Sequence, residues 1–122
     1  MRAVVDIESL VLQRVTRLKA ERSGIRIRDE LFPGAFGEWG LISVLGSDDH
    51  PEAYEFIESE TSWLRPEAPK EYKRAAKGGR SVSVIIPDNV LDDVSSELER
   101  QVMEEVTVCS YSSLGLFPRS MG

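Results

Sequence analysis

Cysteine is almost absent from this chain, in which Cys109 is the one thiol among 122 residues. A single cysteine cannot form an intramolecular disulfide, and it excludes a zinc site built from several cysteines. A chain without disulfides is typical of a reducing compartment, so we expect a cytoplasmic location. Because Cys109 falls within a predicted strand, we expect it to be a small buried hydrophobic residue and no nucleophile.

Long hydrophobic runs are absent as well. No segment approaches the roughly 18 consecutive apolar residues of a membrane span, and acidic residues interrupt the N-terminal segment MRAVVDIESL where a signal peptide has its hydrophobic core. We therefore expect no association with a membrane. Amides are also scarce, with one asparagine and two glutamines, and this bias is in the direction seen in proteins of thermophiles.

The catalytic signatures that can be read from a sequence are missing too. The chain contains no Gly-x-Gly-x-x-Gly, no phosphate-binding Gly-Lys-Ser/Thr, no His-Glu-x-x-His and no Gly-x-Ser-x-Gly. His50 is the single histidine, and together with Asp48 and Asp49 it is the candidate for acid–base chemistry or for metal ligation. Three adjacent residues rarely converge on one ion, so we expect no metal or other cofactor. These absences argue against an enzyme without deciding the question.

What is present is the composition of an ordinary globular protein, with 41% hydrophobic and 30% charged residues. A chain of 122 residues is long enough for one hydrophobic core, so we expect residues 1–122 to form a single α/β domain. Residues 119–122 are expected to fray at its end. The formal net charge of −6 argues against nucleic acid as the partner.

A buried strand followed directly by a helix is predicted between Gly40 and Leu64. Residues 41–45 form an apolar run, which is typical of a strand covered on both faces. Asp49 and Glu52 have the spacing of a helix capping box, and apolar residues at steps of three and four continue to Leu64. If this strand is parallel to its neighbours, the turn at residues 46–50 lies at the carboxyl edge of a sheet, where open α/β sheets usually bind ligands. The structural interpretation is that Ser47, Asp48 and Asp49 cap the helix that follows.

Hydrophobic periodicity predicts the other elements. It indicates a helix from about Ile7 to Ser23, an edge strand at 25–28 and a short helix at 66–77. A strand at 81–86, a helix after Pro87 and a strand at 106–110 form a strand–helix–strand unit with parallel strands. The predicted fold class is therefore α/β, or α+β, with a mixed sheet of four to five strands and helices packed on it. A ferredoxin-like split βαβ arrangement with an added C-terminal helix and strand is the alternative.

The segment from Asp29 to Trp39 is predicted to be a loop because it contains two glycines and a proline. Three large aromatic residues in it, Phe32, Phe36 and Trp39, indicate that the loop packs on a core edge or lies in a subunit interface. A lid over a ligand is the other interpretation.

A cluster of basic residues accompanies the short helix at 66–77. Four of them share one face of this helix and the fifth follows a glycine pair: Lys70, Lys73, Arg74, Lys77 and Arg80. The functional interpretation is a binding site for an anionic group. The structural interpretation is that cations near a helix C-terminus offset the helix dipole.

These observations predict a small cytoplasmic binding or regulatory domain that forms a homo-oligomer, most simply a homodimer. Its partner would be an anionic small molecule or another protein. One alternative is a small hydrolase or metal-dependent enzyme that uses the turn at Asp48, Asp49 and His50. Another alternative is a structural subunit of a larger complex.

Overall fold

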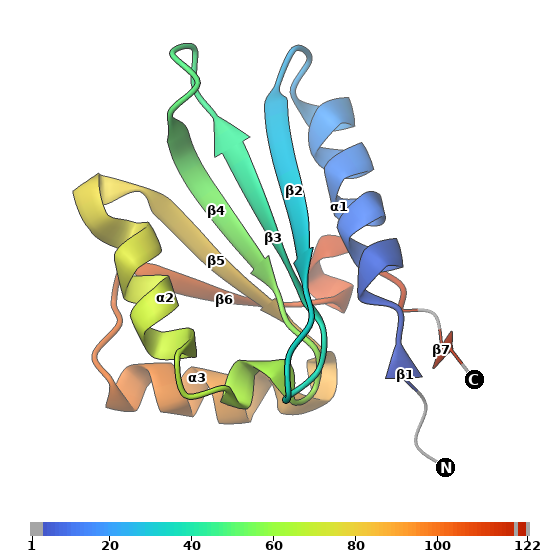
Figure 1. Ribbon diagram of the computed structural model, residues 1–122, viewed down its shortest axis with the longest axis vertical. Helices are drawn as coiled ribbons and strands as arrows, with labels where there is room; N and C mark the ends of the chain where they lie inside the picture. Colours follow the sequence, from blue (N-terminus) through green and yellow to red (C-terminus); the bar gives the residue numbers. More distant parts are fainter. Residues whose placement is uncertain (1–3, 119, 122) are drawn as a thin grey trace.

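The computed structural model describes residues 4–118 and 120–121 (Figure 1). Within these residues one mixed sheet contains five strands in the order β2-β3-β4-β5-β6, and β1 pairs with β7 in a separate ribbon. Neighbours are antiparallel from β2 to β4 and parallel from β4 to β6. The bounds are β1 (Val4–Val5), β2 (Arg26–Phe32), β3 (Trp39–Leu45), β4 (Pro51–Ile57), β5 (Ser81–Ile86), β6 (Val106–Ser110) and β7 (Ser120–Met121).

Helices cover both faces of this sheet (Figure 1). On one face lies α1 (Ile7–Glu21), and on the other lie α2 (Ala68–Ala76) and α3 (Leu91–Arg100). Short 3-10 turns span Ser62–Leu64, Lys77–Gly79, Asp88–Val90 and Ser112–Leu114. A five-stranded mixed sheet with three packed α-helices in the described residues confirms the predicted α/β class. The ferredoxin-like alternative is wrong because the strands follow one another in sequence order across the sheet.

None of the helices in the described part of the chain is long and apolar enough to cross a bilayer.

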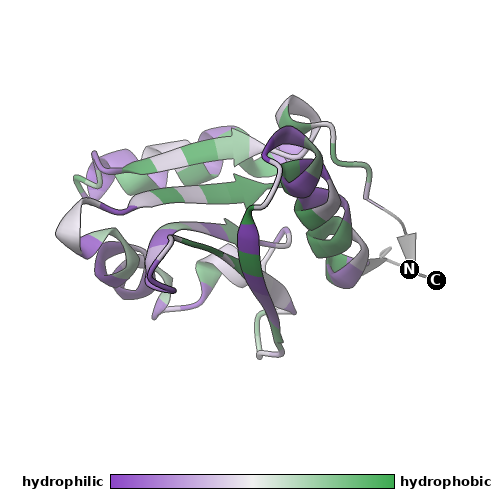
Figure 2. Cartoon of the chain, turned by 90° about the horizontal axis from the view of Figure 1, so that it is seen from above, coloured by the Kyte–Doolittle hydropathy of each residue, from purple (hydrophilic) through white to green (hydrophobic). Residues whose placement is uncertain are grey.

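Helix α1 forms as its sequence predicts. Asp6 caps it by accepting a hydrogen bond from the backbone N–H of Ser9 at 3.1 Å, which satisfies one of the unpaired donors of the first turn. Hydrophobic and hydrophilic bands alternate along the helix in Figure 2, and the apolar side chains face the sheet. Gly40 on β3 allows this close approach, because a Cβ atom there would lie 2.5 Å from Cγ2 of Val11.

The prediction of a helix after residue 49 is wrong, since Pro51–Ile57 forms strand β4. Its apolar residues fit a period of two as well as a helical period, with Phe56 facing α2 and Ile57 facing α1. Of the two residues taken for a capping box, Asp49 lies in a hairpin turn and Glu52 lies on β4. In the turn, the carboxylate of Asp48 accepts from the backbone N–H of His50 at 3.2 Å. Pro51 is tolerated as the first residue of a strand. Pairing with β3 on one side and β5 on the other then fixes β4 as a central strand.

The boundaries of the predicted aromatic loop also need correction. Residues 29–32 extend the edge strand β2, and Trp39 begins β3. Phe32 pairs with Trp39 across the two strands, so the connecting loop contains only residues 33–38. The rings of these two residues stack across the strands, so the hairpin continues up to Pro33.

The strand–helix–strand unit predicted at the C-terminal end is confirmed. Strands β5 and β6 are parallel neighbours, and α3 connects them. Beyond them the chain returns to α1, where Leu116 is buried in the core on that face and Phe117 remains exposed. Of the four residues expected to fray, Ser120 and Met121 pair with β1, while residues 119 and 122 lie outside the described residues.

Candidate functional site

A cleft of about 510 Å³ opens on the face of the sheet that carries α2. We call it the aromatic compartment, because most of its floor is aromatic. The floor residues come from β2, β3 and β4: Phe32, Trp39, Leu41, Tyr54 and Phe56. The rim residues come from α2 and from the position just before β5: Glu71, Arg74, Ala75 and Arg80.

Strand pairing holds the aromatic floor in place. The rings of Phe32 and Trp39 stack with their centroids 4.5 Å apart, and Trp39 and Phe56 follow at 5.9 Å, both with interplanar angles of 21°. Phe56 in turn meets the edge of the Tyr72 ring on α2 at 4.8 Å. Since Trp39 and Phe56 are buried, the floor is rigid, while Phe32 and Tyr54 are only partly covered. Such a surface can stack with a flat ring.

The two arginines at the rim have no acidic partner among the described residues. Neither Arg74 nor Arg80 forms an ion pair or a side-chain hydrogen bond there, although the guanidinium of Arg80 lies 6.0 Å from the centre of the Tyr54 ring. By contrast, Arg14 is held by Glu55, with 2.7 Å between Nε and the carboxylate. Unpaired guanidinium groups beside an apolar floor are suited to bind a carboxylate, sulfate or phosphate.

A second hollow of about 500 Å³ adjoins the first, and Phe32, Trp39 and Glu71 line both. We call it the loop compartment, since the loop at residues 33–37 forms one of its walls. Arg65, Pro66 and Glu67 line it from the side of α2. Phe36 also lines it and is 41% exposed, so this ring can be covered further by a ligand or a partner.

Behind the cleft lies a buried charged network centred on Glu58. This carboxylate is fully buried and accepts hydrogen bonds from the hydroxyls of Ser62 and Tyr72 and from Nη1 of Arg65, each at 2.6 Å. The Arg65 guanidinium also lies 3.7 Å from the centre of the Trp39 ring and donates to Oε1 of Glu71. The network therefore connects the aromatic floor to the rim.

The ionisation of this network follows from its burial. For Arg65, burial disfavours the charged form, but hydrogen bonding and the charge of Glu58 outweigh it and raise its pKa. Burial, followed by the nearby charge of Glu58, raises the pKa of Tyr72 well above its ordinary value. Tyr72 is therefore a neutral donor to Glu58, and Arg65 is permanently charged.

No protein-family model, curated protein or solved structure matches this chain. Any function must therefore be argued from the site itself. Such an argument can use three features of the cleft. They are a rigid apolar floor, two guanidinium groups without an acidic partner among the described residues, and one glutamate at the boundary of the compartments.

Two sets of residues that the sequence predicts separately meet in this cleft. Phe32 and Trp39 form part of the floor, and Arg74 and Arg80 lie at the rim. The lysines predicted with these arginines, Lys70, Lys73 and Lys77, are exposed and line neither compartment. Sequence reasoning missed Tyr54 and Phe56, because both lie in the segment predicted as a helix. Their alternation with Ala53 and Glu55 was the signal for a strand.

The candidate catalytic turn lies elsewhere. Asp48, Asp49 and His50 are exposed in the hairpin between β3 and β4. The ligand site expected there required β3 to be parallel to its neighbours, and β3 is antiparallel to both of them, so this condition is not met. Asp49 pairs with Arg26, while Asp48 lies 3.4 Å from Nδ1 of His50. Residues 4–118 and 120–121 contain no group of three metal-ligating side chains.

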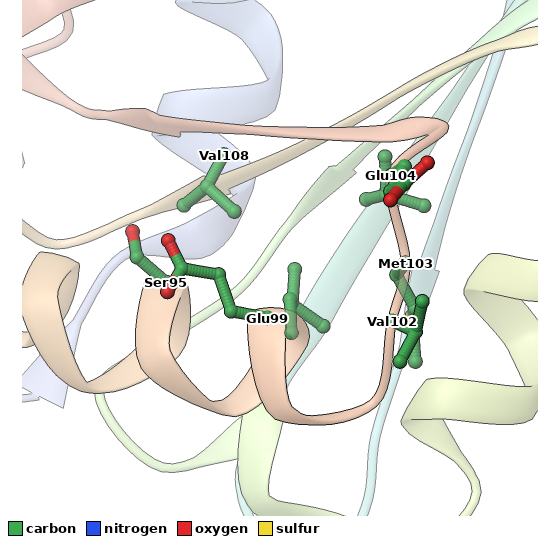
Figure 3. A pocket seen from close by; sticks show the side chains of 8 residues that line it. Ser95, Glu99, Val102, Met103, Glu104 and Val108 are labelled. Carbon is green, nitrogen blue, oxygen red and sulfur yellow. The ribbon is translucent and has the colours of Figure 1, made fainter.

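A further hollow of about 390 Å³ lies between α3 and β6. In Figure 3, Ser95 and Glu99 extend from α3 on the side of Val108, and Glu104 lies on the segment that leads into β6. It contains two carboxylates and no cation, which makes it unsuited to an anionic ligand. Nearby on β6, burial raises the pKa of the half-buried Cys109 thiol, which disfavours the reactive thiolate.

Proposed function

We propose that this protein is a binding domain for a small anionic ligand that contains a flat apolar ring. The ring would stack on the partly exposed aromatic floor, and the anionic group would be held by Arg74 and Arg80. The observation that carries the proposal is the location of these two unpaired guanidinium groups at the rim of an aromatic cleft.

The chemistry of each part supports this function. A planar ring stacked on one of the two partly exposed rings, Phe32 or Tyr54, would bury apolar surface and gain stacking energy of about 1–3 kcal/mol. A charge-assisted hydrogen bond to a guanidinium adds about 1.5–3 kcal/mol when it is shielded from water. Together these contributions are typical of micromolar rather than nanomolar binding, once the cost of association is included.

Isothermal titration calorimetry with naphthyl phosphate, a ring with one anionic group, tests the proposal. The variant Arg74→Glu should weaken binding at least tenfold, because it replaces an attractive charge at the rim by a repulsive one. The matched control is Lys73→Glu, since Lys73 is the neighbouring residue on α2, is exposed and does not line the cleft. If both variants lost the same affinity, the effect would come from the overall charge and not from Arg74. The absence of binding to the wild-type protein would overturn the proposal.

The enzyme alternative has less support. Asp48, Asp49 and His50 lie on an exposed turn, and Asp49 already pairs with Arg26. A general acid or base is usually set in a cleft that excludes water, which this exposed turn does not provide. If the wild-type protein hydrolysed members of an ester panel and a folded Asp49→Ala variant did not, the enzyme alternative would regain support.

The predicted homo-oligomer and cytoplasmic location remain part of the proposal. The partly exposed Phe36 and the half-exposed Leu64 could lie in a contact between copies of the chain. Native mass spectrometry of the purified protein measures the number of chains and any retained ligand in one spectrum. A mass equal to one chain would contradict the homo-oligomer and leave the ligand site unaffected.

A further inference from the structure

The charges in the cleft change along its length. Two arginines and one glutamate line the aromatic compartment, whereas one arginine and two glutamates line the loop compartment. Glu71 belongs to both compartments and so marks the boundary between them. The charge of Arg65, the one cation of the loop compartment, is further offset by the buried Glu58 at 2.6 Å. One end of the cleft therefore favours an anion, and the other end favours a hydrogen-bond donor.

Glu71 has one oxygen available to a ligand. Its Oε1 accepts from Nε of Arg65 at 2.9 Å and from Nη2 at 2.6 Å, so both lone pairs of this atom are used. Its Oε2 accepts no hydrogen bond from any residue that the structure describes. The side chain is 31% exposed and lines both compartments, so a ligand in the cleft can approach the carboxylate.

The orientation of Glu71 is fixed by Arg65. That guanidinium is itself held on its other side by Glu58 and by the carbonyl of Ser62, and it lies over the Trp39 ring. The carboxylate at the boundary is therefore preorganised, which increases the affinity for a ligand that fits it. A ring without a donor at this place would cover a charged oxygen and leave it without a hydrogen bond.

We infer that the ligand is an aromatic acid with an amino group on the side of the ring opposite its acidic group, and that Glu71 binds this amino group. The inference rests on the proposed function of the cleft and names its ligand class more closely. The acid contacts Arg74 and Arg80, the ring stacks on the aromatic floor, and an N–H donates to Oε2 of Glu71. Nucleotides with an amino-substituted base have this chemistry, and so have simpler aminoaryl acids.

Calorimetric titration with two matched pairs of probes tests the inference. The first pair is adenosine monophosphate and purine riboside monophosphate, which differ by the amino group. The second pair is aminonaphthalene sulfonate and naphthalene sulfonate, with the amino group on the ring distant from the sulfonate. In wild type we expect the amino member of at least one pair to bind about tenfold more tightly, which is the effect of one hydrogen bond to a charged group. The pair that shows the difference identifies the source of the ligand.

The variant Glu71→Gln assigns the effect to this residue. Its amide oxygen can keep the contact with Arg65, while its NH₂ group replaces the acceptor at the boundary by a donor. The tenfold preference should therefore disappear, and it should persist in the control Glu38→Gln, an exposed residue that lines neither compartment.

The outcomes separate this inference from the proposed function. Equal binding of both members of each pair to wild type would overturn the inference and leave the proposed function standing. A preference that survives Glu71→Gln would overturn the role of Glu71. Failure of all four probes and of naphthyl phosphate would overturn both proposals together.

Discussion

At the scale of single residues, the buried carboxylate of Glu58 organises the side chains behind the cleft. Glu58 is fully buried, and three donors from Ser62, Arg65 and Tyr72 compensate for its desolvation. The described residues contain no buried side-chain polar atom without a hydrogen-bond partner, so this network is complete. A complete network of this kind fixes one arrangement of side chains, and here it fixes Arg65 on the ring of Trp39.

Stability should decrease at alkaline pH because of two buried tyrosines. Burial is the main reason why the pKa values of Tyr72 and Tyr111 are raised above their ordinary value of 10.0. Above pH 10 the unfolded chain loses these protons while the folded chain keeps them, so the free energy of unfolding falls. The fall approaches about 1.4 kcal/mol per pH unit for each tyrosine, until the pH reaches the folded-state pKa. Urea denaturation between about pH 8 and pH 11 measures it.

The variant Tyr72→Phe is the control for this pH dependence. It removes one titrating hydroxyl, so the decrease above pH 10 should become shallower than in wild type. At neutral pH the same variant should be about 1–3 kcal/mol less stable, because Glu58 loses a donor. An unchanged slope would show that Tyr72 does not contribute to the decrease.

At the scale of elements, the ends of the helices show where the sequence is not optimal for its structure. Helix α3 ends in a Schellman motif, with the N–H of Met103 donating to the carbonyl of Leu98 at 3.1 Å and that of Val102 to Glu99 at 3.0 Å. The left-handed position in such a motif usually holds glycine, but here Val102 occupies it with a φ of 55°. A β-branched residue is strained in this region.

Replacing this valine by glycine should stabilise the protein. Val102 is 70% exposed, so Val102→Gly removes backbone strain with little loss of packing. The strain of about 1–2 kcal/mol is partly offset by the greater backbone entropy of glycine in the unfolded chain, and a net gain of about 1 kcal/mol is expected. Thermal or urea unfolding measures this gain, with Val102→Ala as the control that shortens the side chain and keeps most of the strain. A destabilised glycine variant would refute the account.

The contact between α1 and β3 should tolerate no added methyl group. A Cβ atom at Gly40 would lie 2.5 Å from Cγ2 of Val11, whose β-branched side chain cannot rotate away easily. We expect Gly40→Ala to lower the free energy of unfolding by about 1–3 kcal/mol. The double variant Gly40→Ala with Val11→Ala should regain part of that loss, and strict additivity of the two changes would contradict the proposed clash.

At the scale of the whole molecule, one sheet separates two hydrophobic cores, and the C-terminal segment packs against α1. The face with α2 and α3 and the face with α1 each have their own cluster of buried side chains. The C-terminal segment completes the second cluster, because Leu116 is buried there. Gln13 on α1 fixes the next residue by exchanging two hydrogen bonds of 2.9 Å with the backbone of Phe117.

Neighbouring residues of this segment should therefore differ sharply in their effect on stability. Leu116 is 2% exposed, so Leu116→Ala should cost about 2–5 kcal/mol of unfolding free energy. Phe117 is 72% exposed and its contact with Gln13 uses only the backbone, so Phe117→Ala should change stability by less than about 0.5 kcal/mol. Chemical denaturation of both variants gives the comparison. A large loss in Phe117→Ala would indicate that this ring is covered by a second copy of the chain.

The sequence by itself determined the elements whose hydrophobic pattern allows one interpretation. The apolar positions of α1 fit a helical period over four turns, and a parallel strand pair joined by a helix follows from residues 81–110. The edge strand was also predictable, because Ile27 alternates with the exposed Arg26 and Arg28. In each case local periodicity and the final packing agree, so no distant residue is needed to decide the structure.

Only the tertiary structure decided the segment at residues 51–57 and the site that depends on it. Its apolar residues fit a helix or a strand, and hydrogen bonding to β3 and β5 selects the strand. The cleft follows from that selection, because Tyr54 and Phe56 join Trp39 on one face of the sheet and Arg74 and Arg80 reach it from sequence positions farther along. Residues so far apart in the chain meet through strand pairing, which no local pattern specifies.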